Sequence, residues 1–173
     1  MAVKIAVLTS KIRSICEEEI LKHPYTETGG ILMGYINSVG HIIVTHASPP
    51  GPKAKHFRNS ITFDVDFCQS FIDRVYFESG GAYTYVGDWH CHKSDEIEPS
   101  PIDHDTLKRE SLNSESRIEY PIIIIIGSKR HFFSKEVGIV GIKGYYFDRI
   151  SQSLIEVSIQ YQEGCAKEYS VSF

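Results

Sequence analysis

The sequence has few cysteines, and their spacing matches no common metal or redox motif. Its 173 residues include Cys16, Cys68, Cys91 and Cys165, with no Cys-x-x-Cys pair. A structural zinc knuckle and a dithiol redox site both need such pairs, so neither is indicated. The Pro-Cys-x-x-Cys ligand pair of zinc-dependent deaminases is missing as well. We expect reduced, mostly buried thiols.

A hydrophobic segment long enough to cross a membrane is also lacking. The longest apolar run, Ile122 to Ile126, is far shorter than the roughly 20 residues that span a bilayer. The apolar stretch Ala2 to Leu8 is interrupted by Lys4, and no small-residue cleavage site follows it. The sequence therefore predicts a cytoplasmic protein without a secretory signal and without a membrane partner.

Positive charge is scarcer than negative charge. The chain has 18 Lys and Arg against 22 Asp and Glu, and a formal net charge of −4. No basic patch with interleaved aromatic residues is visible, which argues against nucleic acid as a partner. The compact basic cluster from Lys53 to Arg58 is interpreted as a solvated loop. A rim that contacts an acidic partner or peptide tail is the alternative.

The hydrophobic pattern predicts one domain over residues 1–173. The expected elements are strand 3–8, helix 10–23 ended by Pro24, strands 29–36 and 41–48 joined by a turn at 37–40, helix 64–79 ended by Gly80 and Gly81, strand 84–92, a helix from Pro101, and strands within 120–128, 137–148 and 153–161. Hairpins that alternate with helical crossovers favour an α/β fold of α+β-like character, a mixed sheet flanked by helices.

The segment SPIDHDTLKRESL predicts a helix from Pro101, because proline suits the first position of a helix. Ile102, Leu107 and Leu112 are its expected inward-facing residues.

Two histidines, His90 and His92, end the predicted strand 84–92. Alternate residues of a strand project from one face, so both imidazoles point together and Cys91 points away. Their Cα atoms would lie roughly 6.6 Å apart, close enough to share a metal ion. Asp88 shares the face but would lie roughly 13 Å from His92, too far for comfortable ligation of one ion. Alone, either histidine would be interpreted as a buried residue with hydrogen-bond partners.

Asp103 is the expected third ligand. It falls in the first turn of the helix from Pro101, and a helix start that faces a strand end brings its carboxylate to the histidines. Two histidines and one aspartate leave a coordination position for water, as in catalytic zinc sites. Ser100-x-x-Asp103 is also similar to a capping box, and capping is compatible with catalysis.

A metal-bound water needs a carboxylate to accept its proton, and Glu27 is the candidate. Gly29 and Gly30 follow it and allow another backbone segment to approach closely. A solvated surface glutamate is the commoner role of this residue type. Six other histidines have no usable spacing relation to the site: His23, His41, His46, His56, His104 and His131.

The segments TETGGILMGY and YVGDWHCH, followed by Ser100 and Asp103, resemble the JAMM motif of MPN-domain metalloproteases, including stand-alone prokaryotic members. The family pattern is Glu, then His-x-His, seven residues, Ser, two residues and Asp, and this chain has all five at those offsets. One departure is Lys93, where many members have Pro. It puts the conformation of the following loop in question without removing a ligand.

The resemblance implies an MPN/JAMM architecture, with a curved sheet of cytidine-deaminase-like type, and one Zn²⁺ per chain bound by His90, His92 and Asp103. It also implies Glu27 as general base and Ser100 as the residue that supports the oxyanion. The implied activity is that of an isopeptidase that hydrolyses the amide bond at the carboxyl end of a ubiquitin-like or similarly conjugated protein. The extended tail of that protein substrate would enter the site.

Residues 61–81, ITFDVDFCQSFIDRVYFESGG, resemble the deconjugating isopeptidases of bacterial antiphage systems of the CBASS type. Those enzymes release a conjugated nucleotidyltransferase or ubiquitin-like protein. A protease that trims a sulfur-carrier or other ubiquitin-like precursor is an alternative. The alternative from another class is a non-catalytic MPN scaffold for protein assembly, and the complete set of five polar residues weighs against it.

Overall fold

The computed structural model describes residues 5–95, 97–113, 119–130 and 136–162. Along them the elements are β1 (Ile5–Thr9), α1 (Ser10–Lys22), β2 (Gly29–Ile36), β3 (Ile42–Ala47), β4 (Lys55–His56), β5 (Ile61–Thr62), α2 (Val65–Glu78), β6 (Thr84–His92), α3 (Pro101–Leu112), β7 (Ile122–Arg130), β8 (Val137–Asp148) and β9 (Ser153–Gln162). Cys165, Lys4 and the first residues of the predicted strand 3–8 lie outside the described residues.

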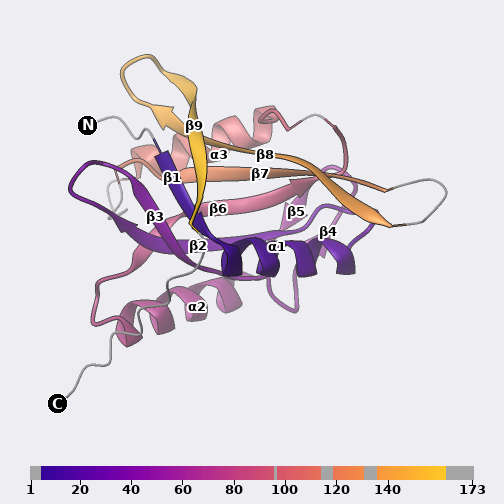
Figure 1. Ribbon diagram of the computed structural model, residues 1–173, viewed down its shortest axis with the longest axis horizontal. Helices are drawn as coiled ribbons and strands as arrows, with labels where there is room; N and C mark the ends of the chain where they lie inside the picture. The colour runs from indigo at the N-terminus through magenta and orange to yellow at the C-terminus, as the bar shows by residue number, and fades with distance from the viewer. Residues whose placement is uncertain (1–4, 96, 114–118, 131–135, 163–173) are drawn as a thin grey trace.

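Seven strands form a closed barrel in the order β1-β3-β2-β6-β7-β8-β9 (Figure 1). The pairing is mixed, as predicted, because β6 runs antiparallel to β2 and parallel to β7. The predicted mixed sheet is confirmed, but it closes on itself into a barrel, because β9 pairs with β8 on one side and with β1 on the other. This closure joins the first and last described strands, a pairing that local sequence patterns do not record.

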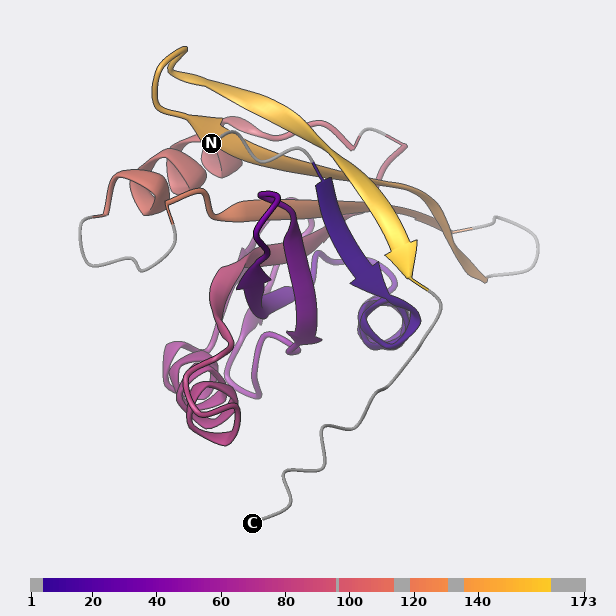
Figure 2. The same ribbon diagram turned by 60° about the vertical axis from the view of Figure 1, so that its left-hand side comes forward.

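Helices cover both faces of the sheet (Figure 2). α1 buries Ile12, Cys16 and Ile20 against one face. α2 packs on the opposite face against β2, where Ile31 is buried, and α3 packs there against β7, where Ile123 is buried. Because β6 lies between β2 and β7 in the barrel, its outer face lines the space between α2 and α3.

The predicted turns and helix ends have clear physical causes. In the β2–β3 turn, the Asn37 side-chain oxygen accepts the amide of His41 at 2.9 Å, and Gly40 has a φ of 84°. α2 begins after Asp64, whose carboxylate accepts the Phe67 amide at 3.3 Å. It ends before Gly80, whose φ of 62° favours glycine.

Two predictions about local structure were wrong. The segment Lys53–Arg58 is not simply a solvated loop, since Lys55 and His56 form β4 and pair with β5. In α3, Ile102 is 65% exposed and Leu112 is 52% exposed, whereas Leu107 is buried. α3 contacts β7 and β8, whereas Ile102 and Leu112 lie at its two ends and remain exposed to solvent.

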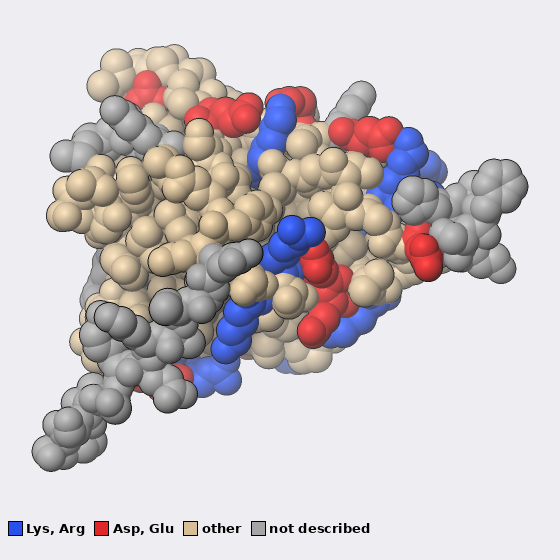
Figure 3. Space-filling view, viewed as in Figure 1, with Lys and Arg blue, Asp and Glu red and all other residues tan. Residues whose placement is uncertain are grey.

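Acidic and basic side chains are interleaved on the face of the molecule that carries α1 (Figure 3). Arg13 and Glu17 form one such pair on α1, with Nε and Oε1 2.6 Å apart. The thiols of Cys16, Cys68 and Cys91 are buried and unbonded to one another, as predicted. None of the helices in the described ranges is long and apolar enough to span a membrane.

Candidate metal centre

Strand β6 places His90 and His92 on its outer face, between α2 and α3. The alternate residues Trp89 and Cys91 are fully buried on the opposite face. Trp89 fixes this register, because its indole nitrogen donates to the Ser48 carbonyl oxygen at 3.0 Å. The two imidazoles therefore project together, and their Nε2 atoms lie 2.8 Å apart.

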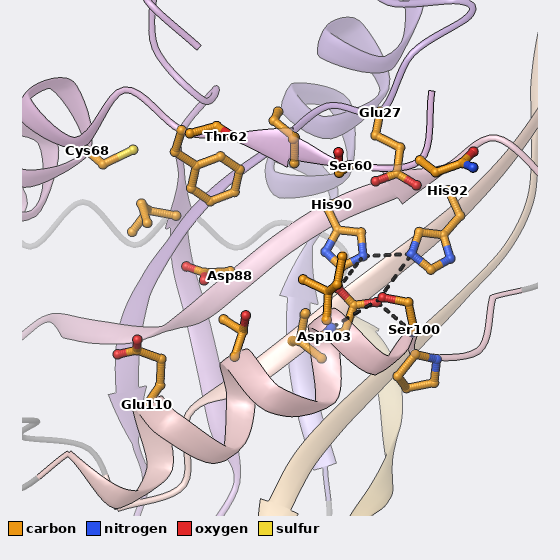
Figure 4. Close-up of a pocket in the computed structure, with 18 of the residues that line it drawn as sticks. Glu27, Ser60, Thr62, Cys68, Asp88, His90, His92, Ser100, Asp103 and Glu110 are labelled. Carbon is orange, nitrogen blue, oxygen red and sulfur yellow. Dashed lines mark hydrogen bonds and ion pairs between the residues drawn. The ribbon is translucent and has the colours of Figure 1, made fainter. Parts of the chain in front are cut away.

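Helix α3 brings Asp103 to these imidazoles. The Nε2 atoms of His90 and His92 lie 3.5 and 3.6 Å from its two carboxylate oxygens. A capping box fixes the start of the helix: the Asp103 amide donates to Ser100 Oγ at 3.3 Å, and the Ser100 amide donates to Asp103 Oδ2 at 2.7 Å. Helix capping thus orients a carboxylate toward the end of β6 (Figure 4).

The donor set of His90, His92 and Asp103 suits a zinc ion. One ligand atom from each lies within 4.8 Å of the other two. Two ligands at about 2.1 Å from a tetrahedral ion are roughly 3.4 Å apart, close to the separations between the histidines and the carboxylate. Two imidazoles and one carboxylate are common zinc ligands, and they leave a coordination position for a reactant.

The electrostatics of the cluster keep Asp103 ionised and make Glu27 a stronger base. Burial raises the pKa of Asp103, but hydrogen bonds from His90 and His92 outweigh it and hold that pKa well below its usual range. Burial also raises the pKa of Glu27, and the nearby histidines oppose this effect only in part. A carboxylate with a raised pKa holds a proton more readily.

Glu27 lies just before β2, and its carboxylate points toward the two imidazoles (Figure 4). Its residue exposure is 9%. The close approach predicted at Gly29 and Gly30 is confirmed: a Cβ at Gly30 would lie 1.8 Å from the Ser48 carbonyl oxygen, and one at Gly29 would lie 2.4 Å from the Trp89 carbonyl oxygen. The glycines let β2 pack tightly against its neighbours and so bring Glu27 to the end of β6.

Lys93, the departure from the JAMM pattern, is anchored rather than left in solvent. Its Nζ donates to the Ser128 hydroxyl oxygen on β7 at 3.1 Å. Ser128 Oγ also lies 3.0 Å from the Cys91 Sγ. These contacts hold the chain against β7 at the point where it leaves β6, just before the segment that leads to Ser100.

A groove of about 1000 Å³ continues from the metal centre between α2, α3 and the β4–β5 hairpin. Asp88 lines it on the same face as His90 but stands apart from the three ligands, as its strand position predicted. Its carboxylate accepts the Tyr85 hydroxyl at 3.1 Å. Burial raises the pKa of Asp88 to about 7, against the opposing effect of that hydrogen bond.

His56 and the hairpin around it belong to the site, although the sequence did not predict this. His56 Nδ1 lies 2.9 Å from the Glu27 carbonyl oxygen, although the two residues are 29 positions apart. Arg58, from the cluster interpreted as a solvated loop, lines the groove, which agrees with the alternative interpretation as a rim. No sequence signal could have linked His56 to Glu27, because their contact arises from the path of the loop between β3 and α2.

The fold and the site define a barrel domain with a candidate mononuclear metal centre and an adjacent carboxylate. The chain is 31% identical over 135 residues to a probable metalloprotease from Sinorhizobium fredii, covering 76% of this chain and 82% of that protein. It therefore belongs to the metalloprotease family of that relative. No protein-family model matches the chain.

Two further relatives carry a more specific name, CD-NTase/cGAS isopeptidase. The relative from Vibrio cholerae is 28% identical over 116 residues, which cover 67% of this chain and 71% of that protein. The relative from Escherichia coli is 29% identical over 112 residues, covering 65% and 69%.

A solved structure of a Desulfitobacterium hafniense protein superposes with a TM-score of 0.62 at 16% identity, covering 92% of this chain and 94% of that one. At this identity, the likeness concerns the fold alone.

Proposed function

We propose that this protein is a zinc-dependent isopeptidase of the JAMM/MPN type. The observation that carries the proposal is the convergence of His90, His92 and Asp103 on one point, beside the Glu27 carboxylate and within a groove. Membership in a metalloprotease family supports the use of a metal. A non-catalytic scaffold would need neither the complete ligand set nor a partly buried carboxylate beside it.

Each residue of the site has a distinct role in the proposed hydrolysis. Zinc, when bound, supplies a Lewis acid that polarises the scissile carbonyl and lowers the pKa of a bound water to about 7. A Glu27 carboxylate oxygen takes the proton of the attacking water and delivers it to the leaving nitrogen, a transfer that its raised pKa assists. Ser100 Oγ accepts the Asp103 amide and keeps its own proton free to donate to the oxyanion.

The proposed substrate is a protein whose extended carboxyl-terminal tail enters the groove. Ile61 and Thr62 of β5 line it, and in the two-stranded sheet of β4 and β5 no further described strand covers the other edge of β5. An extended peptide can add to such an edge through main-chain hydrogen bonds. The names of the relatives favour a conjugated CD-NTase, and the resemblance of residues 61–81 favours a bacterial antiphage system. A ubiquitin-like or sulfur-carrier precursor is the second candidate.

Cleavage of a CD-NTase conjugate, with and without a chelator, tests the proposal. Glu27→Gln should keep stoichiometric zinc and lose cleavage, because the amide cannot accept the proton. His90→Ala should lose both zinc and cleavage. Glu17→Gln is the control. It makes the same change of charge in the exposed ion pair between Glu17 and Arg13 on α1, and it should change neither the zinc content nor the cleavage. Full turnover by Glu27→Gln, or a folded protein that takes up no zinc, would contradict the proposal.

A further inference from the structure

The backbone of Glu27 is held by two consecutive residues of the β4–β5 hairpin. The Glu27 amide donates to the Phe57 carbonyl oxygen at 2.8 Å. The Glu27 carbonyl oxygen lies 2.9 Å from His56 Nδ1. Since a carbonyl oxygen can only accept, Nδ1 of His56 carries the proton of this hydrogen bond. Hydrogen bonds from the hairpin, which is not part of the barrel, therefore hold both peptide groups that flank the Glu27 Cα.

The residues that follow Glu27 are fixed by the barrel itself. The Thr28 carbonyl oxygen accepts the Cys91 amide at 2.8 Å, and Gly29 pairs with His90. From Thr28 onward, the chain is thus in register with the strand of the metal ligands. The direction of the Glu27 Cα–Cβ bond depends in addition on the two contacts from the hairpin, because these contacts orient the peptide groups on either side of it.

The His56 ring is itself held in place. It stacks on His23, with ring centroids 3.6 Å apart and an angle of 12° between the ring planes. His23 follows α1, and its Nε2 lies 3.3 Å from the Glu19 carboxylate. Glu19 is 6% exposed and also lies 3.3 Å from the Thr28 hydroxyl. The stack therefore connects α1, the hairpin and the segment that carries Glu27.

We propose that His56 is a positioning residue that orients Glu27 for proton transfer through its hydrogen bond to the Glu27 carbonyl. The expected effect of His56 on catalysis rests on the proposed function, whereas its structural effect on the position of Glu27 does not. Loss of the bond lets the Glu27–Thr28 peptide rotate and moves the carboxylate away from the metal centre. Misplacement of a reacting group by about 1 Å can cost up to ~10²-fold in rate.

Three variants separate the hydrogen bond from the ring. His56→Asn places an amide nitrogen where Nδ1 stood and keeps the donor. His56→Gln, one methylene longer, moves that nitrogen to the position of Nε2, away from the Glu27 carbonyl. His56→Phe keeps the aromatic stack and removes the donor. Zinc content and thermal unfolding, measured on each variant, show that the metal centre and the fold are retained.

The first measurement is amide hydrogen exchange of Glu27 by NMR, which needs no substrate. We expect exchange about 10-fold faster in His56→Gln and His56→Phe, and near the wild-type rate in His56→Asn, since local opening controls protection. The second measurement is kcat and KM on the CD-NTase conjugate. We expect kcat about 10-fold or more lower in the Gln and Phe variants, unchanged KM, and recovery to within about 3-fold in the Asn variant.

Specific outcomes overturn the inference. Wild-type exchange and kcat in His56→Gln would show that the bond does not orient Glu27. If His56→Asn and His56→Gln lose Glu27 amide protection and kcat equally, the stacked ring, and not the hydrogen bond, positions Glu27. If the Phe variant fails to fold, the Asn and Gln pair decides alone. If the wild-type protein cleaves nothing while the exchange pattern holds, the proposed function fails and the structural clamp on Glu27 stands.

Discussion

At the scale of single residues, Ser100 has a structural role in the helix cap and a proposed role in catalysis. Its oxygen accepts the Asp103 amide and so starts α3, which in turn orients the Asp103 carboxylate toward His90 and His92. In the proposed mechanism, its hydroxyl proton is donated to the oxyanion. One residue thus connects the stability of a helix with the geometry of the metal centre, and the two roles can be separated by comparing variants.

Ser100→Ala is expected to lower stability slightly and activity strongly. Loss of the cap costs ~1 kcal/mol of unfolding free energy, whereas loss of an oxyanion donor lowers kcat by about 10²–10³-fold. Ser100→Thr keeps both the capping oxygen and the hydroxyl proton, and its stability and activity should stay near those of the wild type.

Asp64→Ala is the control for the loss of a helix cap. The Asp64 carboxylate accepts the Phe67 amide at the start of α2, so this variant should lose stability without the loss of kcat expected for Ser100→Ala. Urea unfolding and steady-state kinetics give both quantities. Similar kcat in Ser100→Ala and wild type would remove Ser100 from the mechanism.

At the scale of elements, the start of β2 depends on the absence of side chains. A Cβ at Gly30 would lie 1.8 Å from the Ser48 carbonyl oxygen and 2.8 Å from the Trp89 indole nitrogen. These contacts are with backbone and with a fully buried ring, neither of which can move aside easily. The same close packing brings Glu27 within reach of the end of β6.

Gly30→Ala is therefore expected to destabilise the protein by more than ~3 kcal/mol, because a buried clash forces the strands apart. Gly80→Ala is the control: nothing lies within 4 Å of its added Cβ, although its φ is +62°. That strain alone should cost ~1 kcal/mol. Chemical denaturation of both variants measures the difference. Equal free energies of unfolding would show that the barrel relaxes around the added methyl group.

At the scale of the whole molecule, the candidate metal centre is assembled from three separate parts of the fold. His90 and His92 come from β6 within the barrel, Asp103 comes from α3 on its outer face, and Glu27 comes from the segment between α1 and β2. A bound ion would connect β6 to α3. Binding to the folded state alone stabilises that state by mass action.

Zinc is expected to raise the Tm of the wild-type protein. At a free concentration of about 100 times the Kd, the gain is about 2.7 kcal/mol, which corresponds to about 5–10 °C for a domain of this size. His92→Ala should show a much smaller shift, because two ligands remain. Differential scanning fluorimetry with added zinc, and then with a chelator, measures this. An equal shift in His92→Ala would place the zinc site elsewhere in the molecule.

The sequence by itself determined the local elements and the residues that meet at the site. Hydrophobic periodicity predicted α2, the β2–β3 hairpin and β6, because side chains three to four residues apart on a helix, or two apart on a strand, share a face. The same periodicity placed His90 and His92 together, and the capping pattern placed Asp103 at a helix start. The structure brings these three residues into one cluster, while their roles stay predictions.

The tertiary structure alone decided the closure of the barrel, the exposure of Ile102 and Leu112, and the contact of His56 with Glu27. Closure pairs β1 with β9, about 150 positions apart along the chain. His56 reaches Glu27 because the loop after β3 folds back over the start of β2. Such contacts depend on how whole elements pack in space, and periodicity, caps and turns describe only residues that are near one another in the sequence.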